Sequence, residues 1–253
     1  MLARFSREQV MMSAITSSGV HTMKIGIIGA GNIGHTLARR FRELGHDVLI
    51  ANSRGPETLT HIEQETGAVA VTSREAARGA EVVIVTIPEA NVAKLPRDLF
   101  DGVPEDTVVV DTGNYYPQQR DGRIGPIEDG VPESQWTSDQ LGRPVIKAFN
   151  NIYAEHLGTL GKPSTAEERI ALPVSGDDEN AKAKVLKLID ELGFDGVDAG
   201  SLSDSWRQQP GSPVYGADRD QEGVRQGLLD AQRERSPEWR ATEHSPGTFE
   251  APR

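Results

Sequence analysis

A short apolar segment that runs directly into a glycine-rich turn constrains the fold of this chain more than any other feature. Residues 24–29 read KIGIIG, and the overlapping GAGNIG places Gly29, Gly31 and Gly34 at G-x-G-x-x-G spacing. Residues 32–44 follow with an apolar stripe at helical spacing. In such a strand–turn–helix unit the glycines allow a tight turn, close approach of a pyrophosphate, and packing of helix on strand. The segment therefore predicts a dinucleotide-binding unit with the pyrophosphate at the helix N-terminus.

Strand-like apolar segments recur along the first two hundred residues, with helical patterns between them. Further strands are expected near residues 47–52, 68–71, 81–88, 106–113, 143–150 and 169–176. Such alternation is typical of a parallel sheet that helices cover on both faces. We therefore predict the α/β class, with a Rossmann-type, doubly wound, mostly parallel sheet and a small C-terminal addition.

The 253 residues are expected to form one main domain with appendages. Residues 23–200 are predicted to be the dinucleotide-binding domain, and residues 201–235 a helical segment that contributes to the active site. Residues 1–22 and 236–253 have few aliphatic side chains and are predicted to be disordered. Residues 113–143 are rich in glycine and proline without periodicity, so a long functional loop is expected there.

Composition narrows the range of partners. The formal net charge of −11 disfavours binding to nucleic acid or to anionic lipid. No segment has the apolar length that a membrane span needs, and the histidines lack the spacing of a metal site. The absence of cysteine excludes disulfides and thiolate chemistry and fits a cytoplasmic protein. We expect a cytoplasmic protein that acts on a small molecule, without nucleic acid, membrane or metal.

The end of the second predicted strand identifies the dinucleotide. An acidic side chain is usual there, because it accepts hydrogen bonds from the ribose hydroxyls and repels a 2′-phosphate. This chain has Asn52, Ser53 and Arg54 instead. Asn52 removes the repulsion, while Ser53 offers a hydroxyl and Arg54 a forked cation suited to a phosphate. The substitution favours NADP(H) over NAD(H).

Four segments together resemble a known family: IGIIGAGNIGHTLARRFRELGHDVLIANSR, VVIVTIP, RPVIKAFNNI and GFDGVDAGSL. They are similar to the NADP-dependent oxidoreductases typified by coenzyme F-420:NADP oxidoreductase, and also to the cytosolic domain of the STEAP metalloreductases. The resemblance covers about residues 23–215. It implies a Rossmann domain, NADPH as the hydride donor, a flavin or coenzyme F-420 as the acceptor, and a homodimer.

The resemblance also implies roles for individual residues. The phosphate turn matches Gly29 to Gly34, with backbone N–H groups donated by Asn32 and Ile33, and the 2′-phosphate pair matches Ser53 and Arg54. The family's cofactor loop matches Thr86, Ile87 and Pro88. The segment Lys147 to Asn150, which includes Ala148, should approach the nicotinamide.

Hydride transfer depends on proximity and orientation, so no catalytic triad is expected. The candidate catalytic residues are Lys147, Asn150 and Tyr115. Lys147 and Asn150 lie where a predicted strand ends, and Tyr115 follows the carboxyl end of the fifth strand, where open α/β sheets bind ligands. Tyr115 or its neighbour Tyr116 could donate a proton or stack on a flat acceptor. Lys147 could instead make a structural contact, and the two tyrosines could instead pack under the loop.

Three functions remain open from the sequence. The leading hypothesis is hydride transfer between NADP(H) and a flavin- or deazaflavin-type acceptor similar to coenzyme F-420. A second is NADPH-dependent reduction of a small carbonyl or imine, although enzymes of that kind append a large helical domain and little apolar sequence remains after residue 200. A third is a non-catalytic NADP(H)-sensing module.

Overall fold

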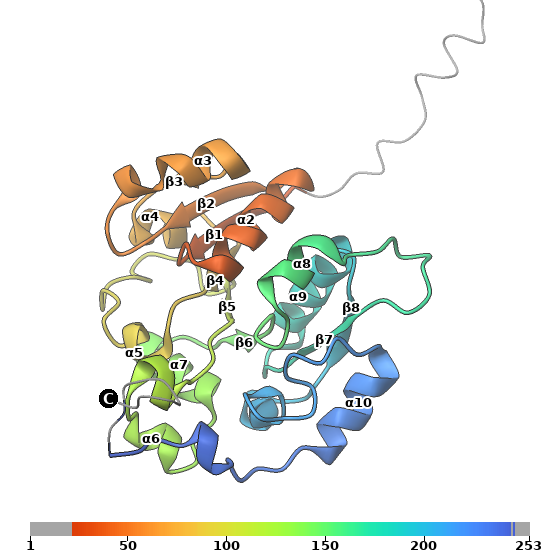
Figure 1. Cartoon of the computed structure of the whole chain (residues 1–253). Coiled ribbons are helices and arrows are strands. Elements are labelled where there is room, and N and C mark those ends of the chain that lie inside the picture. Colours follow the sequence, from red (N-terminus) through yellow and green to blue (C-terminus); the bar gives the residue numbers. More distant parts are fainter. Residues whose placement is uncertain (1–21, 244, 246–253) are drawn as a thin grey trace, which may run out of the picture.

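The larger sheet carries six parallel strands in the order β3-β2-β1-β4-β5-β6 (Figure 1). The structure is a computed structural model that describes residues 22–243 and 245. The strands are β1 (Lys24–Ile28), β2 (Asp47–Ala51), β3 (Val69–Ala70), β4 (Val82–Val85), β5 (Val108–Asp111) and β6 (Ile146–Lys147). The winding reverses between β1 and β4, and open α/β sheets bind ligands beyond the carboxyl ends of the strands at such a point. The predicted fold class is confirmed.

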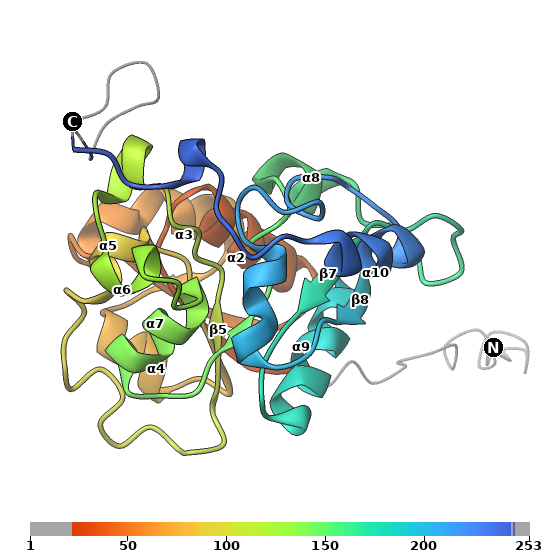
Figure 2. The same cartoon turned by 90° about the horizontal axis from the view of Figure 1, so that it is seen from below.

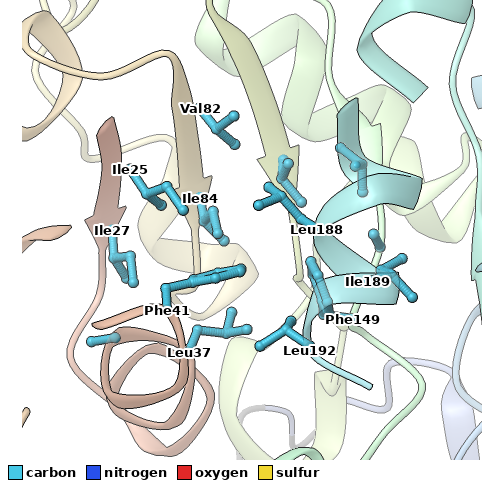
Figure 3. Packing of buried hydrophobic residues seen from close by; sticks show 14 of the residues in the cluster. Ile25, Ile27, Leu37, Phe41, Val82, Ile84, Phe149, Leu188, Ile189 and Leu192 are labelled. Atoms are coloured by element: carbon cyan, nitrogen blue, oxygen red, sulfur yellow. The ribbon is translucent and has the colours of Figure 1, made fainter. Parts of the chain in front are cut away.

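Helices cover both faces of this sheet, which is why its strands are apolar on both sides. One face packs against α2 (Asn32–Glu43), α3 (Thr60–Thr66), α8 (Ala154–Thr159) and α9 (Glu179–Glu191). Figure 3 shows Phe41 of α2 and Leu188 of α9 in this core together with strand side chains such as Ile84. The other face packs against α4 (Ser73–Arg78) and the residues that follow α5 (Glu89–Val92). Even the longest helix of the described residues, α9 with 13 residues, does not meet the length and apolarity that a membrane span requires.

A second, two-stranded sheet extends the fold. Strands β7 (Ala171–Val174) and β8 (Asp195–Asp198) are parallel, and an antiparallel bridge between Lys147 and Ser175 joins them to the end of β6. The 3-10 helix η3 (Leu202–Gln208) and α10 (Gln221–Asp230) follow. Val224 and Leu228 of α10 pack on Val197 of β8, so the small C-terminal addition covers this second sheet.

Residues 113–143 contain more regular structure than their sequence indicates. They form the π-helical turn η2 (Pro117–Asp121), α6 (Gly125–Glu128) and α7 (Glu133–Leu141). The expected long loop is therefore largely helical. The reason is the inward face of α7, where Glu133, Ser134 and Thr137 are buried beside Trp136. A helix that buries polar side chains has no apolar stripe from which its period could be recognised.

The chain after α10 runs back towards the green segment of residues 113–143 (Figure 2). The Gln118 amide donates to the carbonyl oxygens of Pro237, at 3.2 Å, and Arg240, at 2.9 Å. The Ala241 N–H donates to Glu128 at 2.8 Å. Residues 236–243 are thus fastened to the core, unlike the disordered tail predicted from residue 236. The predicted disorder at residues 1–21, 244 and 246–253 lies outside the described residues.

Candidate functional site

The glycine turn after β1 has the shape that a pyrophosphate requires. Gly29 has φ +119°, and a Cβ atom there would lie 2.2 Å from the carbonyl oxygen of Thr86. A Cβ atom on Gly34 would lie 2.0 Å from the carbonyl oxygen of Gly29, so α2 can approach the turn only without a side chain at that position. Around Gly31, in contrast, a Cβ atom would meet nothing within 4 Å. The open side of the turn therefore faces the space in which a pyrophosphate would lie.

The N-terminus of α2 points into the same space. Gly31 is the N-cap and provides no side-chain hydrogen bond, and the first turn of this 12-residue helix contains no acidic residue. The first N–H groups of a helix lack intrahelical partners and carry its positive dipole end. These donors can hold the cofactor phosphates, with Asn32 and Ile33 in the predicted positions.

A cavity of about 530 Å³ on one side of the turn, which we name the adenosine-end cavity, suits the adenosine half of the cofactor. Asn52 shapes its rim, because its side-chain oxygen accepts from the Arg54 N–H at 2.9 Å and its amide donates to Thr58 at 2.8 Å. Ser53 and Arg54 are exposed, and the Arg54 guanidinium has no hydrogen bond or ion pair among the described residues. This wall also includes five residues that were not predicted from the sequence: Ile28, Ser73, Asn91, Lys94 and Leu95.

A second cavity, of about 450 Å³, lies on the other side of the turn. It shares Gly31 and the predicted cofactor loop, Thr86 to Pro88, with the first cavity. Its remaining wall comes from the start of α2, from segments after β5 and β6 and from the C-terminal addition: Asn32, Ile33, Thr112, Gly113, Asn114, Tyr116, Arg120, Phe149, Asn150, Ile152, Tyr153, Ala154 and Tyr215. A dinucleotide that spans the glycine turn would place its nicotinamide here, so we name it the nicotinamide-end cavity.

The tyrosines of this wall are Tyr116, Tyr153 and Tyr215, and Tyr115 is not among them. Tyr115 is fully buried, and its hydroxyl accepts a hydrogen bond from the Ile124 N–H at 3.0 Å beneath the cavity. The hydroxyl groups of Tyr116 and Tyr215 contact each other, and their rings lie 5.9 and 6.1 Å from the Trp239 ring. Burial raises the pKa of Tyr116, against the lowering effects of the hydrogen bond from Tyr215 and the charge of Arg120. The geometry therefore moves the candidate proton donor from Tyr115 to Tyr116.

Asn150 is at the cavity wall, and its side chain is committed to other protein groups. The Asn150 amide donates to Asn114 at 3.0 Å and to the carbonyl oxygen of Gln208 at 2.7 Å, and its oxygen accepts from Gln208 at 3.0 Å. The preceding Phe149 has φ +61°, which is unusual for a side chain of this size and turns the backbone towards the cavity. Asn150 is thus placed to fix the wall, while Ala148 lies in the apolar core.

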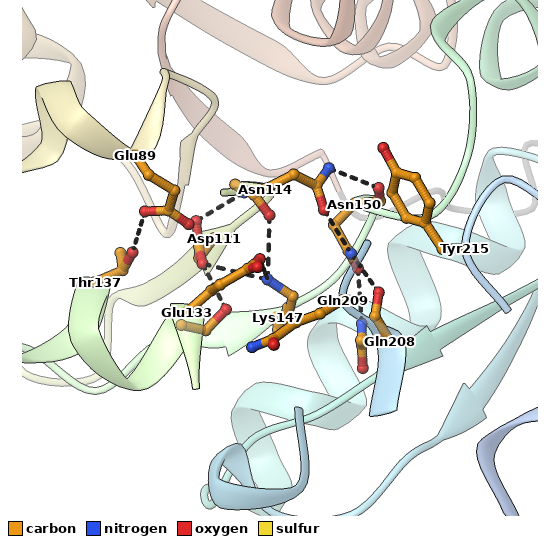
Figure 4. Close-up of polar contacts among 12 residues, drawn as sticks. Glu89, Asp111, Asn114, Glu133, Thr137, Lys147, Asn150, Gln208, Gln209 and Tyr215 are labelled. Carbon is orange, nitrogen blue, oxygen red and sulfur yellow. Dashed lines mark hydrogen bonds and ion pairs between the residues drawn. The ribbon is translucent and has the colours of Figure 1, made fainter. Parts of the chain in front are cut away.

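Lys147 lies one layer below the wall, in a buried charge cluster with Glu89, Asp111 and Glu133 (Figure 4). Its ammonium group donates to the Gly113 carbonyl oxygen at 3.1 Å and lies 3.6 Å from Glu133 and 4.0 Å from Asp111. Lys147 is fully buried and does not contact the cavity. In this geometry it can act on a ligand only through Gly113, which does line the cavity.

Glu89 is the third carboxyl group of this cluster, and it makes no ion pair with Lys147. It accepts a hydrogen bond from the Thr137 hydroxyl at 3.0 Å, and its other oxygen has no hydrogen-bond partner among the described residues. Burial, followed by the nearby charge of Asp111, raises the pKa of Glu89 well above its usual range, although the charge of Lys147 lowers it. The folded protein therefore holds a proton on Glu89 at pH values where a free glutamate has lost it.

We expect Glu89→Gln to raise the melting temperature at pH 8 and to have little effect below about pH 4. The raised pKa means that the stability contributed by the Glu89 proton is fully present below the usual glutamate pKa and is lost as pH rises through the folded pKa. Glutamine mimics the protonated carboxyl and removes that loss. Thermal unfolding of both proteins from pH 4 to 9 measures this pH-dependent loss of stability. A melting-temperature difference that did not change with pH would contradict the raised pKa of Glu89.

Comparison with known proteins agrees with this geometry. The profile of the family described as NADP oxidoreductase, coenzyme F-420-dependent, matches residues 24–115. The hypothetical protein SMa0349 from Sinorhizobium meliloti is 32% identical, with a TM-score of 0.65 over 78% of this chain and 94% of that one. A protein of Arthrobacter sp. FB24, provisionally assigned as an F-420-dependent NADP reductase, shares the fold at 24% identity, with a TM-score of 0.59 over 72% of this chain and 87% of that one.

One curated relative matches over a shorter length. Escherichia coli (strain K12) protein YjhV is 41% identical over 76 residues, which are 30% of this chain and 48% of YjhV. The match thus spans about half of that relative. The family profile covers the phosphate turn and the adenosine-end cavity, and SMa0349 extends the likeness over most of both chains. The chain therefore belongs to the family of coenzyme F-420-dependent NADP oxidoreductases.

Proposed function

We propose that this protein transfers a hydride between NADP(H) and a flat flavin- or deazaflavin-type ring such as coenzyme F-420. The observation that carries the proposal is the pair of cavities that meet over the glycine turn. One cavity ends at the uncommitted Arg54 cation, and the other has aromatic side chains in its wall. The family profile and the name given to the Arthrobacter structure support an acceptor of this class.

One group of residues would bind NADPH, the hydride donor, and another would bind the acceptor ring. Ser53 and Arg54 would bind the 2′-phosphate, and the α2 N-terminus the pyrophosphate. Thr86 to Pro88 would lie along the cofactor between the two cavities. The rings of Tyr116 and Tyr215 would flank the acceptor, so that it lies flat against the nicotinamide. The bound nicotinamide would supply the hydride, and the protein leaves the proton of the reduced ring to come from solvent.

A panel of acceptors tests this function. Purified protein is mixed with NADPH and, in separate assays, with coenzyme F-420, FMN, the cyclic imine 2-methyl-1-pyrroline, or a small ketone, and NADPH oxidation is followed. We expect the highest kcat/KM with a deazaflavin or flavin. If none of the four acceptors accelerated NADPH oxidation above the rate without protein, the proposal would be wrong.

Reduction of a small carbonyl or imine is a second candidate function. The observation that favours it is the contact between the Tyr116 and Tyr215 hydroxyl groups at the cavity. A carbonyl or imine accepts the hydride on carbon and needs a proton on its oxygen or nitrogen, and a phenol with a raised pKa remains protonated to supply it. A preference for 2-methyl-1-pyrroline or the ketone over both ring acceptors would select this function.

Arg54→Ala should weaken NADPH binding about 10- to 100-fold, the scale of a charge-assisted contact. NADH binding should change less than twofold by the same reasoning, since NADH has no 2′-phosphate. Fluorescence titration with each cofactor measures both affinities. Lys94→Ala is the matched comparison, because Lys94 also lines the adenosine-end cavity but already donates to Asn91 at 2.9 Å. Equal losses for NADPH and NADH in the Arg54 variant would exclude the 2′-phosphate assignment.

A further inference from the structure

The segment after α10 reaches the buried charge cluster beneath the nicotinamide-end cavity. Arg235 forms an ion pair with Glu133, whose side chain is fully buried. The Arg235 guanidinium also donates to the Trp239 carbonyl oxygen at 3.1 Å and to the Gln209 side chain at 3.2 Å. It lies 5.2 Å from the centre of the Tyr115 ring, and its side chain is only 13% exposed. A cation held this closely is part of the interior and not of a solvated tail.

The charges of the cluster balance only when Arg235 is counted. Asp111 and Glu133 are paired with Lys147 and Arg235, which gives two negative and two positive groups. Glu89 adds no charge as long as it keeps its proton. Burying an uncompensated charge is far more costly than burying a pair, so removal of one cation disturbs the whole cluster.

The cluster holds both backbone groups of Gly113, a residue of the cavity wall. Lys147 donates to the Gly113 carbonyl oxygen at 3.1 Å, and the Asp111 carboxylate accepts from the Gly113 N–H at 2.8 Å. A Cβ atom on Gly113 would lie 2.5 Å from a Glu89 oxygen, so the backbone rests directly on the cluster. Gly113 leads into Asn114, which is hydrogen bonded to Asn150 on the opposite segment of the wall.

We propose that Arg235 is a positioning residue of the active site, whose positive charge balances the buried Asp111–Glu133–Lys147 cluster and thereby fixes Gly113 at the floor of the nicotinamide-end cavity. Arg235 lines neither cavity, and the adenosine-end cavity lies on the other side of the glycine turn. The residues that would bind NADPH therefore do not depend on contact with Arg235. This role of Arg235 goes beyond the proposed function. Of the measurements below, only the rate of NADPH oxidation rests on the proposed function.

The test compares four variants that differ in charge: Arg235→Gln, Arg235→Lys, the double variant Arg235→Gln/Glu133→Gln, and Arg233→Gln. The first leaves a surplus negative charge in the cluster, the second keeps the cation, and the third removes one charge of each sign. Arg233 is the matched control, since it is exposed, stacks on Trp206 and touches none of the cluster. The assay is NADPH oxidation with FMN as the acceptor, together with the emission of the bound nicotinamide of NADPH without an acceptor.

We expect Arg235→Gln to lower kcat about tenfold or more, the scale of a slightly misplaced reacting group, with KM for NADPH unchanged. The double variant and Arg235→Lys should recover to within about threefold of the parent, because the buried charge is balanced again. Arg233→Gln should behave as the parent. Emission of bound NADPH should shift in Arg235→Gln and return in the double variant.

If the Arg235–Glu133 ion pair only held the C-terminal segment in place, the double variant would be as impaired as Arg235→Gln, because both lack the ion pair. If the double variant were no better than Arg235→Gln in kcat and in emission, the charge-balance role would be overturned. Parent-like kcat and emission in Arg235→Gln would overturn it as well. If Arg235→Gln did not fold, the double variant and Arg235→Lys would still decide, since both must then fold and retain the parent's nicotinamide emission. Absence of turnover in the parent would count against the proposed acceptor, while the emission comparison would still test Arg235.

Discussion

Gly31→Val should abolish measurable NADPH binding, a loss of at least about 100-fold, while the melting temperature remains near that of the parent. The expectation rests on the open space around Gly31, where a Cβ atom meets no protein atom within 4 Å. A branched side chain there costs the fold little, but it fills the path by which the pyrophosphate reaches the N–H groups of α2. Isothermal titration with NADPH and thermal unfolding of the same samples measure the two effects separately.

Gly34→Val is the matched control and should behave in the opposite way. A Cβ atom at that position would lie 2.0 Å from the Gly29 carbonyl oxygen, so α2 has to shift away from β1 and the protein loses stability before any ligand is added. Normal NADPH affinity in Gly31→Val would show that the pyrophosphate does not lie at Gly31. Similar losses of melting temperature in the two variants would contradict the open space around Gly31.

Tyr116→Phe should lower kcat for a carbonyl or imine acceptor by about 100- to 1000-fold, the usual contribution of a general acid. On the proposal of carbonyl or imine reduction, the Tyr116 hydroxyl would donate the proton, and two neighbours would stabilise the phenolate that remains. Tyr215 donates to it, and the Arg120 guanidinium lies 5.0 Å from the ring centre. Steady-state NADPH oxidation with 2-methyl-1-pyrroline measures the loss. The raised pKa of Tyr116 also predicts that any alkaline decline of the parent rate caused by this group lies at a higher pH than for an ordinary tyrosine.

Tyr115→Phe removes a hydroxyl group from the adjacent residue and serves as the control. Its loss leaves the Ile124 N–H without an acceptor and should lower stability by about 1–3 kcal/mol. Its kcat should stay within about threefold of the parent, because Tyr115 does not touch the cavity. The opposite pattern, with turnover lost in Tyr115→Phe and kept in Tyr116→Phe, would return the proton-donor role to Tyr115.

The cofactor half of the site could be read from sequence because its residues are close together along the chain. Gly29 to Gly34 and Asn52 to Arg54 belong to one strand–helix–strand unit, whose turn chemistry and periodicity are local properties. The doubly wound, mostly parallel sheet followed from the same regular alternation. The contribution of Lys94 to the adenosine-end cavity could not be recognised, because only the three-dimensional course of the chain after β4 brings it to that wall.

The acceptor half could be predicted only in outline, since its chemistry is set by contacts between distant segments. Lys147 was correctly placed near the end of β6, yet its burial beneath Gly113 depends on Glu133 from α7, a helix without an apolar stripe. Tyr115 and Tyr116 are adjacent and chemically identical in sequence. Packing of Tyr115 under Arg235, and of Tyr116 against Tyr215 and Trp239, is what separates them.

The adenosine-end cavity is built from residues close together in sequence, and the nicotinamide-end cavity from distant ones. This difference has a consequence for synthesis of the chain. The wall of the adenosine-end cavity is complete once Leu95 has emerged from the ribosome, because no later residue of the described part of the chain lines it. The nicotinamide-end cavity needs Tyr215, and Trp239 supports its tyrosines. Chains are made from the N-terminus, and early elements begin to fold while later ones are still being added. We therefore expect the NADP(H) half of the site to be able to form before the acceptor half during synthesis, and a bound cofactor would then stabilise the sheet around which the rest assembles.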